Sequence, residues 1–300
     1  MAKEMVLTFL GTGDAIPSKN RNHTSLLLNY GAENILFDCG EGTQRQIRKA
    51  DLNPCKINKI CISHWHGDHI LGLPGLFQTL ALSGYNKGMD IYGPTGSKKF
   101  MKEFISIFVP VFRFDAKVNE VSGKFFETDD FYLESQSMTH GTPCNAYNFV
   151  IKDKLRIDKK KLEKSKLPTG PLLAKLSQGK DVSFEGKKYK SKDFTYVEKG
   201  KKISFVFDTS LNKNIVPFVK GADWLIIESS FDSSMEDLAE EDHHMTVKQD
   251  AEIAKKAKVG KMFLIHVSSR YKSKKFILEE AKAIFPNSVM PHDLDSVSLK

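Results

Sequence analysis

Four side chains that can bind metal ions lie within six consecutive positions of this 300-residue chain: His64, His66, Asp68 and His69. They follow the apolar segment 57–63, which has the composition of a buried strand. Imidazole and carboxylate groups are costly to bury alone, so the fold must bring the end of this strand to a place where they find partners. His64 and His66 are spaced to converge on one ion, with Asp68 and His69 turned toward a neighbouring one. This donor set suits zinc.

Three more candidate ligands each follow an apolar segment elsewhere in the chain: His140, Asp208 and His266. A polar residue that ends an apolar strand lies at the edge of a sheet, where a scaffold can present ligands. Singly, each would more often be a structural residue than a ligand. Together with the 64–69 segment they predict the remaining ligands of a site for two ions.

Short apolar segments rich in β-branched and aromatic residues alternate with segments of helical spacing. Strands are predicted at 5–11, 24–30, 33–40, 57–64, 147–151, 202–208, 222–229 and 261–267. Helices are predicted at 73–83, 97–108, 246–258 and 274–285. Because strands and helices interleave without a regular βαβ period, we expect a mixed α/β fold with sheets covered by helices.

Positive charge is concentrated in one part of the chain. The net charge is +8, but residues 151–202 hold 17 Lys and Arg against 7 Asp and Glu, a local net charge of +10. Prolines and glycines interrupt this segment and it has few apolar residues, so we expect a protruding, mobile element outside the core. Two interpretations stay open here, a solvated lysine-rich surface and an arm that binds an anionic partner.

The sequence also bears on the cellular setting. No apolar run approaches the roughly 18 residues that span a bilayer, so we expect no membrane-embedded segment. The apolar stretch near the N-terminus is too short for a signal peptide and is predicted to be the first strand. The four cysteines form no CxxC pair, which favours a reduced, cytoplasmic setting.

Over nearly its whole length the chain resembles the metallo-β-lactamase superfamily and, within it, the tRNase Z (ribonuclease Z) family. The motifs that carry the resemblance are LGTGDAIPS, FDCGEGTQRQ, SHWHGDHILGLPGL, His140, FDT and IHVSSRY. It implies the metallo-β-lactamase fold, a four-layer αβ/βα sandwich, as a single domain over residues 1–300. Residues 151–202 would be an inserted basic arm of that domain, the exosite with which the family binds tRNA.

The resemblance also implies two zinc ions per subunit. It assigns three ligands to one ion, three to the other and one that bridges both: His64, His66 and His140; Asp68, His69 and His266; and Asp208. Such a pair of ions makes hydroxide available near neutral pH and neutralises charge on an attacked phosphate. Asp38, in FDCGEG, matches the family's first motif and is expected to orient ligands, although a turn Asp before Gly40 is an equally good interpretation.

A helix is expected to begin just after His244, because Thr246 and Gln249 have the spacing of a capping box. The N-terminus of that helix carries partial positive charge, which favours a phosphate group there. The neighbouring His243 is expected to be a surface residue.

The resemblance makes His244 the proton donor to the departing ribose oxygen and Glu228 the residue that orients it. Asp68 would orient the attacking hydroxide as well as bind metal. The chain departs from the family at one point here, because Glu228 is followed by Ser229 and Ser230 where the family commonly has alanine and threonine.

Two further motifs are expected to contact RNA. The segment PSKNRN (17–22) matches the P-x-K-x-R-N loop that the family associates with the RNA 3′ end. Lys19 and Arg21 are suited to grip phosphates, and Asn22 can read polar edges. Arg270, in HVSSRY, is expected to hold phosphate or the loop itself.

These features predict a zinc-dependent endoribonuclease that removes the 3′ trailer from precursor tRNA, leaving a 3′-hydroxyl on the tRNA and a 5′-phosphate on the trailer. The resemblance implies a homodimer in which the arm of one subunit presents tRNA to the active site of the other. The alternative enzyme, a small-molecule or thioester hydrolase of the same fold, has no use for the basic arm. An RNA-binding protein with a decayed metal site is disfavoured, because every expected ligand is present.

Overall fold

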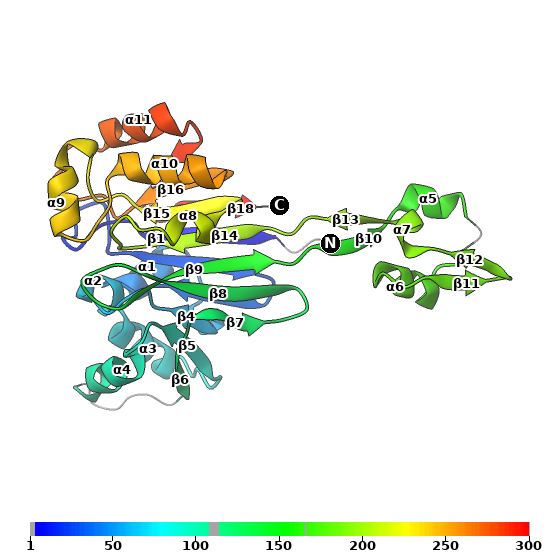
Figure 1. Ribbon diagram of the computed structural model, residues 1–300. Helices are drawn as coiled ribbons and strands as arrows, with labels where there is room; N and C mark the ends of the chain where they lie inside the picture. Colours follow the sequence, from blue (N-terminus) through cyan, green and yellow to red (C-terminus); the bar gives the residue numbers. More distant parts are fainter. Residues whose placement is uncertain (1–3, 108–113, 166, 300) are drawn as a thin grey trace.

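Two sheets that face each other form the centre of the structure (Figure 1). The computed structural model describes residues 4–107, 114–165 and 167–299. Over these residues the first sheet has seven strands, in the spatial order β18 (Ser296–Leu299), β1 (Met5–Gly11), β2 (Ser25–Tyr30), β3 (Glu33–Phe37), β4 (Lys59–Cys61), β5 (Met89–Gly93) and β6 (Ala116–Glu120). The second also has seven, in the order β17 (Ser288–Val289), β16 (Lys261–Ile265), β15 (Trp224–Glu228), β14 (Lys202–Val206), β9 (Cys144–Ile151), β8 (Phe131–Met138) and β7 (Gly123–Glu127).

Helices cover the outer face of each sheet. Three lie against the first sheet and three against the second: α1 (Thr43–Lys49), α3 (Leu73–Leu82) and α4 (Ser97–Ser106); α8 (Ile215–Val219), α10 (Val247–Ala257) and α11 (Lys275–Ile284). Apolar side chains accordingly form one cluster between the sheets and one beneath each helical layer. The four-layer αβ/βα sandwich that the sequence predicts is therefore confirmed.

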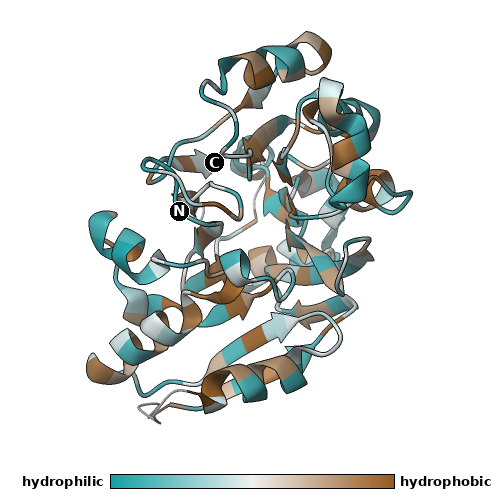
Figure 2. Ribbon diagram, turned by 90° about the vertical axis from the view of Figure 1, so that its left-hand side faces the viewer, coloured by the Kyte–Doolittle hydropathy of each residue, from teal (hydrophilic) through white to brown (hydrophobic). Residues whose placement is uncertain are grey.

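The central strands are buried on both faces, which explains why their sequences are almost wholly apolar (Figure 2). In β14, Ile203 and Phe205 point into the cluster between the sheets, whereas Val206 packs beneath the helices. The rings of Phe37 in β3 and Phe205 stack across the interface, with their centroids 3.7 Å apart. Alternate side chains of one strand thus contribute to the cluster between the sheets and to the cluster beneath the helices.

The strands and helices predicted from the sequence are present, with ends that differ by a few residues. The strand predicted at 57–64 is much shorter as β4, because the chain leaves the sheet after Cys61 and turns into α2 (Gly67–Ile70). The helix predicted at 97–108 corresponds to α4, and Phe108 lies outside the described residues. Short helices complete the sandwich: η1 (Pro54–Lys56), η2 (Ser233–Met235) and α9 (Glu236–Glu241).

An arm extends from two neighbouring strands of the second sheet (Figure 1). After β9 the chain continues into β10 (Lys154–Ile157), which pairs antiparallel with β13 (Thr195–Glu198) before β14 begins. The tip of the arm consists of three helices and a hairpin: α5 (Lys159–Glu163), α6 (Pro171–Ser177) and α7 (Ser191–Phe194), with β11 (Val182–Phe184) and β12 (Lys187–Tyr189).

The tip has an apolar core of its own. Leu167, Leu176, Val182 and Tyr189 are buried there, at most 7% exposed, and partly buried side chains such as Phe184 pack around them. From the composition we expected a protruding, mobile element with few apolar residues to bury, but the tip packs several of them together. The apolar residues of this core stand singly among lysines, so no continuous apolar segment in the sequence predicts it.

The structure also bears on the expected lack of a membrane-embedded segment and on the state of the cysteines. No helix in the described part of the chain is both long and apolar enough to cross a membrane. All four cysteines, Cys39, Cys55, Cys61 and Cys144, are free thiols.

Candidate metal centre

The seven predicted ligands meet where strands of both sheets end. The first sheet contributes the segment after β4, which carries His64 and His66 before α2 and presents Asp68 and His69 from α2 itself. The second sheet contributes the residues that follow β8, β14 and β16: His140, Asp208 and His266. Five of the seven line one hollow of about 360 Å³: His66, Asp68, His140, Asp208 and His266. The buried His64 and His69 lie directly behind it.

The ligand atoms fall into two groups within which they lie no more than 4.8 Å apart: His64, His66 and His140; and Asp68, His69, Asp208 and His266. The Asp208 carboxylate lies between the groups. Its Oδ2 is 3.3 Å from Nε2 of His69 and of His266, and 3.8 Å from Nε2 of His64. This arrangement fits three ligands for one ion, three for another and a carboxylate that bridges them.

Three buried atoms of the cluster test whether these residues fit metal ions. His64 Nε2, His69 Nε2 and Asp208 Oδ1 have no hydrogen-bond partner among the described residues. Buried polar atoms without partners are rare and costly in folded proteins. Since all three belong to the two ligand groups, and since imidazole and carboxylate suit zinc, the donor set fits a pair of such ions.

The Asp38 carboxylate fixes two of the imidazoles. His69 Nδ1 donates to Asp38 Oδ2 at 2.6 Å. His64 Nδ1 donates to Ser63 Oγ at 3.0 Å, and that hydroxyl donates in turn to Asp38 Oδ2 at 2.6 Å. With Nδ1 held in this way, Nε2 of each ring is left for a metal ion. Asp38 lies behind the ligands in a left-handed backbone conformation, with φ 54°.

The other imidazoles are held in the same manner. His266 Nδ1 donates to Ser230 Oγ at 3.0 Å, and the Ser230 hydroxyl donates to Glu228 Oε2 at 2.6 Å. His140 Nδ1 donates to the main-chain carbonyl of His243 at 3.0 Å. The side chain of His243 is exposed, as predicted, but its carbonyl orients a candidate ligand from a left-handed conformation with φ 60°. Sequence reasoning missed these contacts because a backbone carbonyl leaves no signature in a residue type.

Electrostatics divide the imidazoles into two kinds. Burial, reinforced by neighbouring imidazoles, holds the pKa of His64 well below its ordinary value, so the ring is neutral and can offer a lone pair. Burial alone would also lower the pKa of His69 and His266, but Asp208 and Asp68 outweigh it and raise both. The two carboxylates of the second ligand group thus attract positive charge, which a bound cation would supply in place of protons on the imidazoles.

His244 enters the same hollow from the segment before α10. Its Nδ1 donates to Glu228 Oε1 at 2.9 Å, and Glu228 is fully buried at the end of β15. Burial opposes protonation of His244, but the Glu228 charge and hydrogen bond outweigh it and raise its pKa to about 10. The ring is therefore an imidazolium at neutral pH, with Nε2–H available to a substrate.

The capping box predicted beside His244 is confirmed. The Thr246 side chain accepts from the Gln249 backbone N–H, the Gln249 side chain accepts from the Thr246 backbone N–H, and α10 begins at Val247. Glu228 Oε1 also accepts the backbone N–H of Met245 at 3.1 Å. His244 is thus fixed both through its ring and through the backbone that follows it.

The side chains of the predicted RNA-contact loop, residues 17–22, differ in exposure. Lys19 is exposed, but Arg21 is only 6% exposed, and its Nη1 donates to Thr12 Oγ1 at 2.5 Å and to the Pro291 carbonyl at 3.0 Å. A guanidinium engaged in this way is not free to grip a phosphate, so we correct the expected role of Arg21 from RNA contact to support of the loop.

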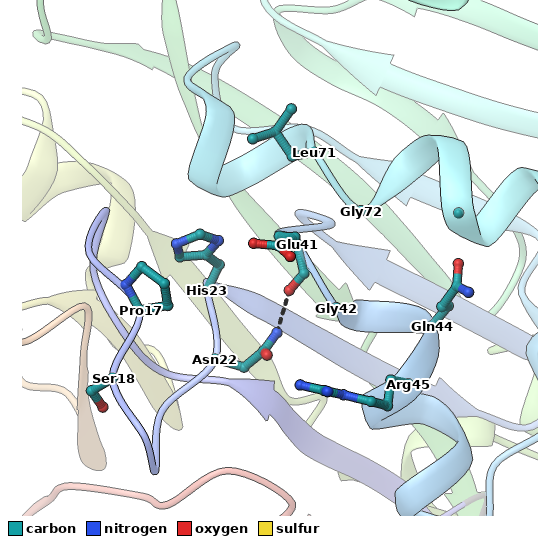
Figure 3. A pocket seen from close by; sticks show the side chains of 11 residues that line it. Pro17, Ser18, Asn22, His23, Glu41, Gly42, Gln44, Arg45, Leu71 and Gly72 are labelled. Atoms are coloured by element: carbon teal, nitrogen blue, oxygen red, sulfur yellow. Dashed lines mark hydrogen bonds between the residues drawn. The ribbon is translucent and has the colours of Figure 1, made fainter. Parts of the chain in front are cut away.

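Asp293 is the anchor of this loop. Its carboxylate accepts the backbone N–H of Asn22 at 2.7 Å, and both the backbone N–H and the hydroxyl of Thr12. The Asn22 side chain donates to the Glu41 carbonyl, at the edge of a hollow of about 520 Å³ between the loop, α1 and the start of α3 (Figure 3). Gln44 and Arg45 of α1 line this hollow and are polar groups that the sequence analysis did not single out.

Arg270 lines the metal hollow. Its Nε donates to Ser268 Oγ at 3.1 Å, and its guanidinium lies over the Phe231 ring, 4.7 Å from the centroid. The side chain is nevertheless exposed, so it could still meet an anionic substrate in the hollow.

One family model covers only part of the chain. Residues 5–101 match the model described as Anti-Pycsar protein Apyc1. This segment, about a third of the chain, runs from β1 into α4 and holds the 64–69 ligands. His140, Asp208, His244, His266 and the arm all lie outside it.

Curated proteins named Ribonuclease Z match along nearly the whole chain. The chain is 38% identical to the protein from Methanothermobacter thermautotrophicus over 298 residues, which is 99% of this chain and 97% of that protein. It is 36% identical to the protein from Nanoarchaeum equitans, covering 98% and 93% of the two chains. It is 37% identical to the protein from Oceanobacillus iheyensis, covering 96% and 98%.

Solved structures resemble the whole chain as well. Human tRNase Z, short form (ELAC1), is 25% identical with a TM-score of 0.69, covering 98% of this chain and 99% of that one. YhfI from Bacillus subtilis, a metallo-beta-lactamase fold protein, is 18% identical with a TM-score of 0.70, covering 99% and 100%. The second likeness concerns the fold alone.

The purified protein should contain about two zinc ions per chain, as a two-ion site requires. His140→Ala should remove a ligand from one group only and lower the content toward one ion. Asp208→Ala should lower the content of both ions, because its carboxylate lies between the groups. Elemental analysis of the purified variants measures this.

His243→Asn provides the control, since asparagine tolerates the left-handed backbone and keeps the carbonyl that holds His140. Its metal content should equal that of the unaltered protein. One ion or none in active protein would contradict the two-ion arrangement.

Proposed function

This chain belongs to the ribonuclease Z family, and we propose how it performs that family's reaction, the endonucleolytic processing of tRNA 3′ ends. The protein is an endoribonuclease that removes the 3′ trailer from precursor tRNA, leaving a 3′-hydroxyl on the tRNA and a 5′-phosphate on the trailer. We propose that two zinc ions per subunit serve the reaction. Their ligands would be His64, His66 and His140; Asp68, His69 and His266; and the bridging Asp208.

The observation that best supports this mechanism is that an imidazolium and the predicted metal ligands line the same hollow. Cutting a ribose–phosphate bond expels an alkoxide, which is a poor leaving group and needs a proton donor. A thioester hydrolase expels a thiolate that leaves unaided and has no need of one. His244, held by Glu228, therefore favours phosphodiester cleavage over the alternative hydrolase.

Zinc ions bound here would make hydroxide available near neutral pH and neutralise charge on the phosphate. Asp68 Oδ2 lies 3.1 Å from His69 Nε2 and 3.2 Å from His266 Nε2, and in this proposal it would orient the attacking hydroxide. As the new P–O bond forms, the bond from phosphorus to the ribose 3′ oxygen breaks and its electron pair moves to that oxygen. His244 Nε2 gives its proton to this oxygen and becomes neutral, while Glu228 stays anionic and keeps the ring in place.

The arm, residues 151–202, is proposed to bind the tRNA body away from the cut. Five lysines line a hollow of about 790 Å³ at its tip: Lys161, Lys164, Lys187, Lys188 and Lys190. Lysine clusters attract the phosphate backbone without reading its sequence. Near the metal hollow we propose RNA contacts for Lys19, Asn22 and Arg270, with Arg21 supporting their loop.

We further propose a cytoplasmic homodimer in which the arm of one subunit presents tRNA to the active site of the other. Exposed apolar side chains on the helical layer over the first sheet support an interface there: Leu71, Leu82, Phe100 and Ile107. Leu82 is 77% exposed and Ile107 73%, so both side chains are available to a partner surface.

The reaction is tested with precursor tRNA labelled at its end. We expect one cut at the 3′ side of the tRNA body and a 3′-hydroxyl on the product, as mapped on a sequencing gel. Chelation of the metal, or Asp68→Ala, should abolish cleavage but leave tRNA binding nearly intact, because binding depends on the arm. Chelated protein that still cuts would contradict the mechanism, and thioester hydrolysis without tRNA cleavage would favour the alternative enzyme.

The proton donor is tested by two variants. His244→Ala should lower the cleavage rate about 10²–10⁴-fold without loss of zinc. Glu228→Gln removes the charge that raises the pKa of His244, so the ring loses its proton at lower pH and the alkaline decline of kcat shifts downward. Rate–pH profiles and zinc analysis measure both effects. A His244→Ala protein that keeps its full rate, or that loses metal, would make His244 a structural residue or a ligand.

The arm is tested by replacing residues 153–200 with a short Gly/Ser linker. Because the tip has its own core, the sandwich should stay folded, bind zinc and hydrolyse bis(p-nitrophenyl) phosphate. The unaltered protein should lose about 10³-fold in tRNA affinity between 50 and 200 mM salt if six phosphate contacts form. The linker variant should bind weakly with little salt dependence.

A variant with the five lysines of the tip changed to glutamine is the matched control, since it removes charge and keeps the arm's core. It should reproduce most of the lost affinity and salt dependence. If neither variant changes the affinity or its slope, the arm is only a solvated surface.

A further inference from the structure

A buried carboxyl group that the mechanism does not use lies beside the Glu228–His244 pair. Asp250, in the first turns of α10, is 0% exposed. Its Oδ2 accepts a hydrogen bond from Ser229 Oγ at 2.7 Å. Its Oδ1 is buried and has no hydrogen-bond partner among the described residues. A carboxyl buried with a single partner is costly, so its placement calls for a reason.

Ser229 lies between two residues that hold imidazoles. Glu228 accepts from His244 Nδ1, and Ser230 accepts from His266 Nδ1, while Ser229 turns to Asp250 on the helix. Its backbone N–H donates to the Ile265 carbonyl at 2.9 Å, so the residue is tied to β16 as well. Alanine at this position could not make the bond to Asp250.

A second tie joins the same two segments. The Val247 backbone N–H donates to the Phe231 carbonyl at 2.8 Å, just beyond the strand end that carries Glu228. One hydrogen bond thus joins α10 to Ser229 and the other joins it to Phe231. His244 lies in the segment that leads directly into α10. Together the two ties set the position of the first turn of α10 relative to Glu228.

We propose that Ser229 and Asp250 are positioning residues for the proton donor: their hydrogen bond fixes the start of α10 against the strand end, and so places His244 for transfer to the leaving oxygen. This inference rests on the proposed role of His244 in the cleavage reaction. Neither side chain touches the substrate, and both act through Glu228 and the backbone around His244.

The charge state of Asp250 agrees with such a role. Burial, and then the negative charge of Glu228, raise the pKa of Asp250 well above its ordinary value, which favours the neutral acid. Glu228 is the charged group that acts on it from the packed strand. A neutral acid adds no second negative charge beside His244, and an amide of the same shape should replace it.

The experiment compares Asp250→Asn, Ser229→Ala and the double variant Ser229→Ala/Asp250→Ala. The asparagine can still accept from Ser229 and should keep kcat and its pH profile. Ser229→Ala leaves a buried carboxyl without any partner and should lower both the melting temperature and kcat. The double variant removes both polar groups, so its melting temperature should recover above that of Ser229→Ala.

The double variant decides between positioning and structure. We expect its kcat on precursor tRNA to stay between about 10-fold and 100-fold low with KM unchanged, because the donor is displaced. The loss with bis(p-nitrophenyl) phosphate should be much smaller, since p-nitrophenolate leaves without protonation. Ser204→Ala, a buried serine in β14 whose Oγ has no hydrogen-bond partner among the described residues, is the matched control and should change neither.

A double variant that regains full kcat and the original pH profile together with its stability would overturn the inference, since the pair would then be structural. So would an Asp250→Asn variant that is as slow as the double variant. If the unaltered protein hydrolyses the small diester but does not cut precursor tRNA, the proposed function fails and takes this inference with it. The unaltered protein alone tests the proposed function, whereas the variants test the inference, so the two failures can be told apart.

Discussion

Two buried carboxylates, one at a strand end in each sheet, set the geometry on which the rest of the site depends. Asp38 follows β3 and Glu228 ends β15, and both are 0% exposed. Each accepts directly from one imidazole and, through a serine hydroxyl, indirectly from another. Burial of a charge is tolerable only with several such donors, so each carboxylate requires its imidazoles in place. The two sheets thus orient their halves of the site by the same device.

Much of the site could be predicted because its ligands follow apolar strands at recognisable spacing. The 64–69 cluster lies after β4, and the capping box marked the start of α10 to within a residue. Arg21 could not be assigned correctly, because its partner Pro291 is 270 residues away and burial is a tertiary property. Ser230 and the His243 carbonyl escaped for a related reason. Their roles depend on where neighbouring strands end in space.

The arm shows where composition misleads. Averaged over residues 151–202 the segment is strongly charged, which is typical of a poorly packed appendage. Its apolar side chains are few, but the α5–α7 helices and the β11–β12 hairpin bring them to one point, where Leu176 is 0% exposed. The lysines are left on the outside of this small core. Dense positive charge and an ordered shape are therefore compatible in one element.

The contact between Asp293 and the loop of residues 12–22 has a consequence for the timing of synthesis. Asn22 precedes Asp293 by 271 residues. A ribosome that adds about 5–20 residues per second therefore makes Asp293 roughly 14–54 seconds after Asn22. His266 likewise follows His64 by most of the chain, and β18, which completes the sheet beside β1, follows Asp293. A nascent chain shorter than 140 residues thus holds four of the seven predicted ligands and an unanchored loop. The site is therefore complete only after the segment that carries His266 and Asp293 has been made and has packed against the first sheet.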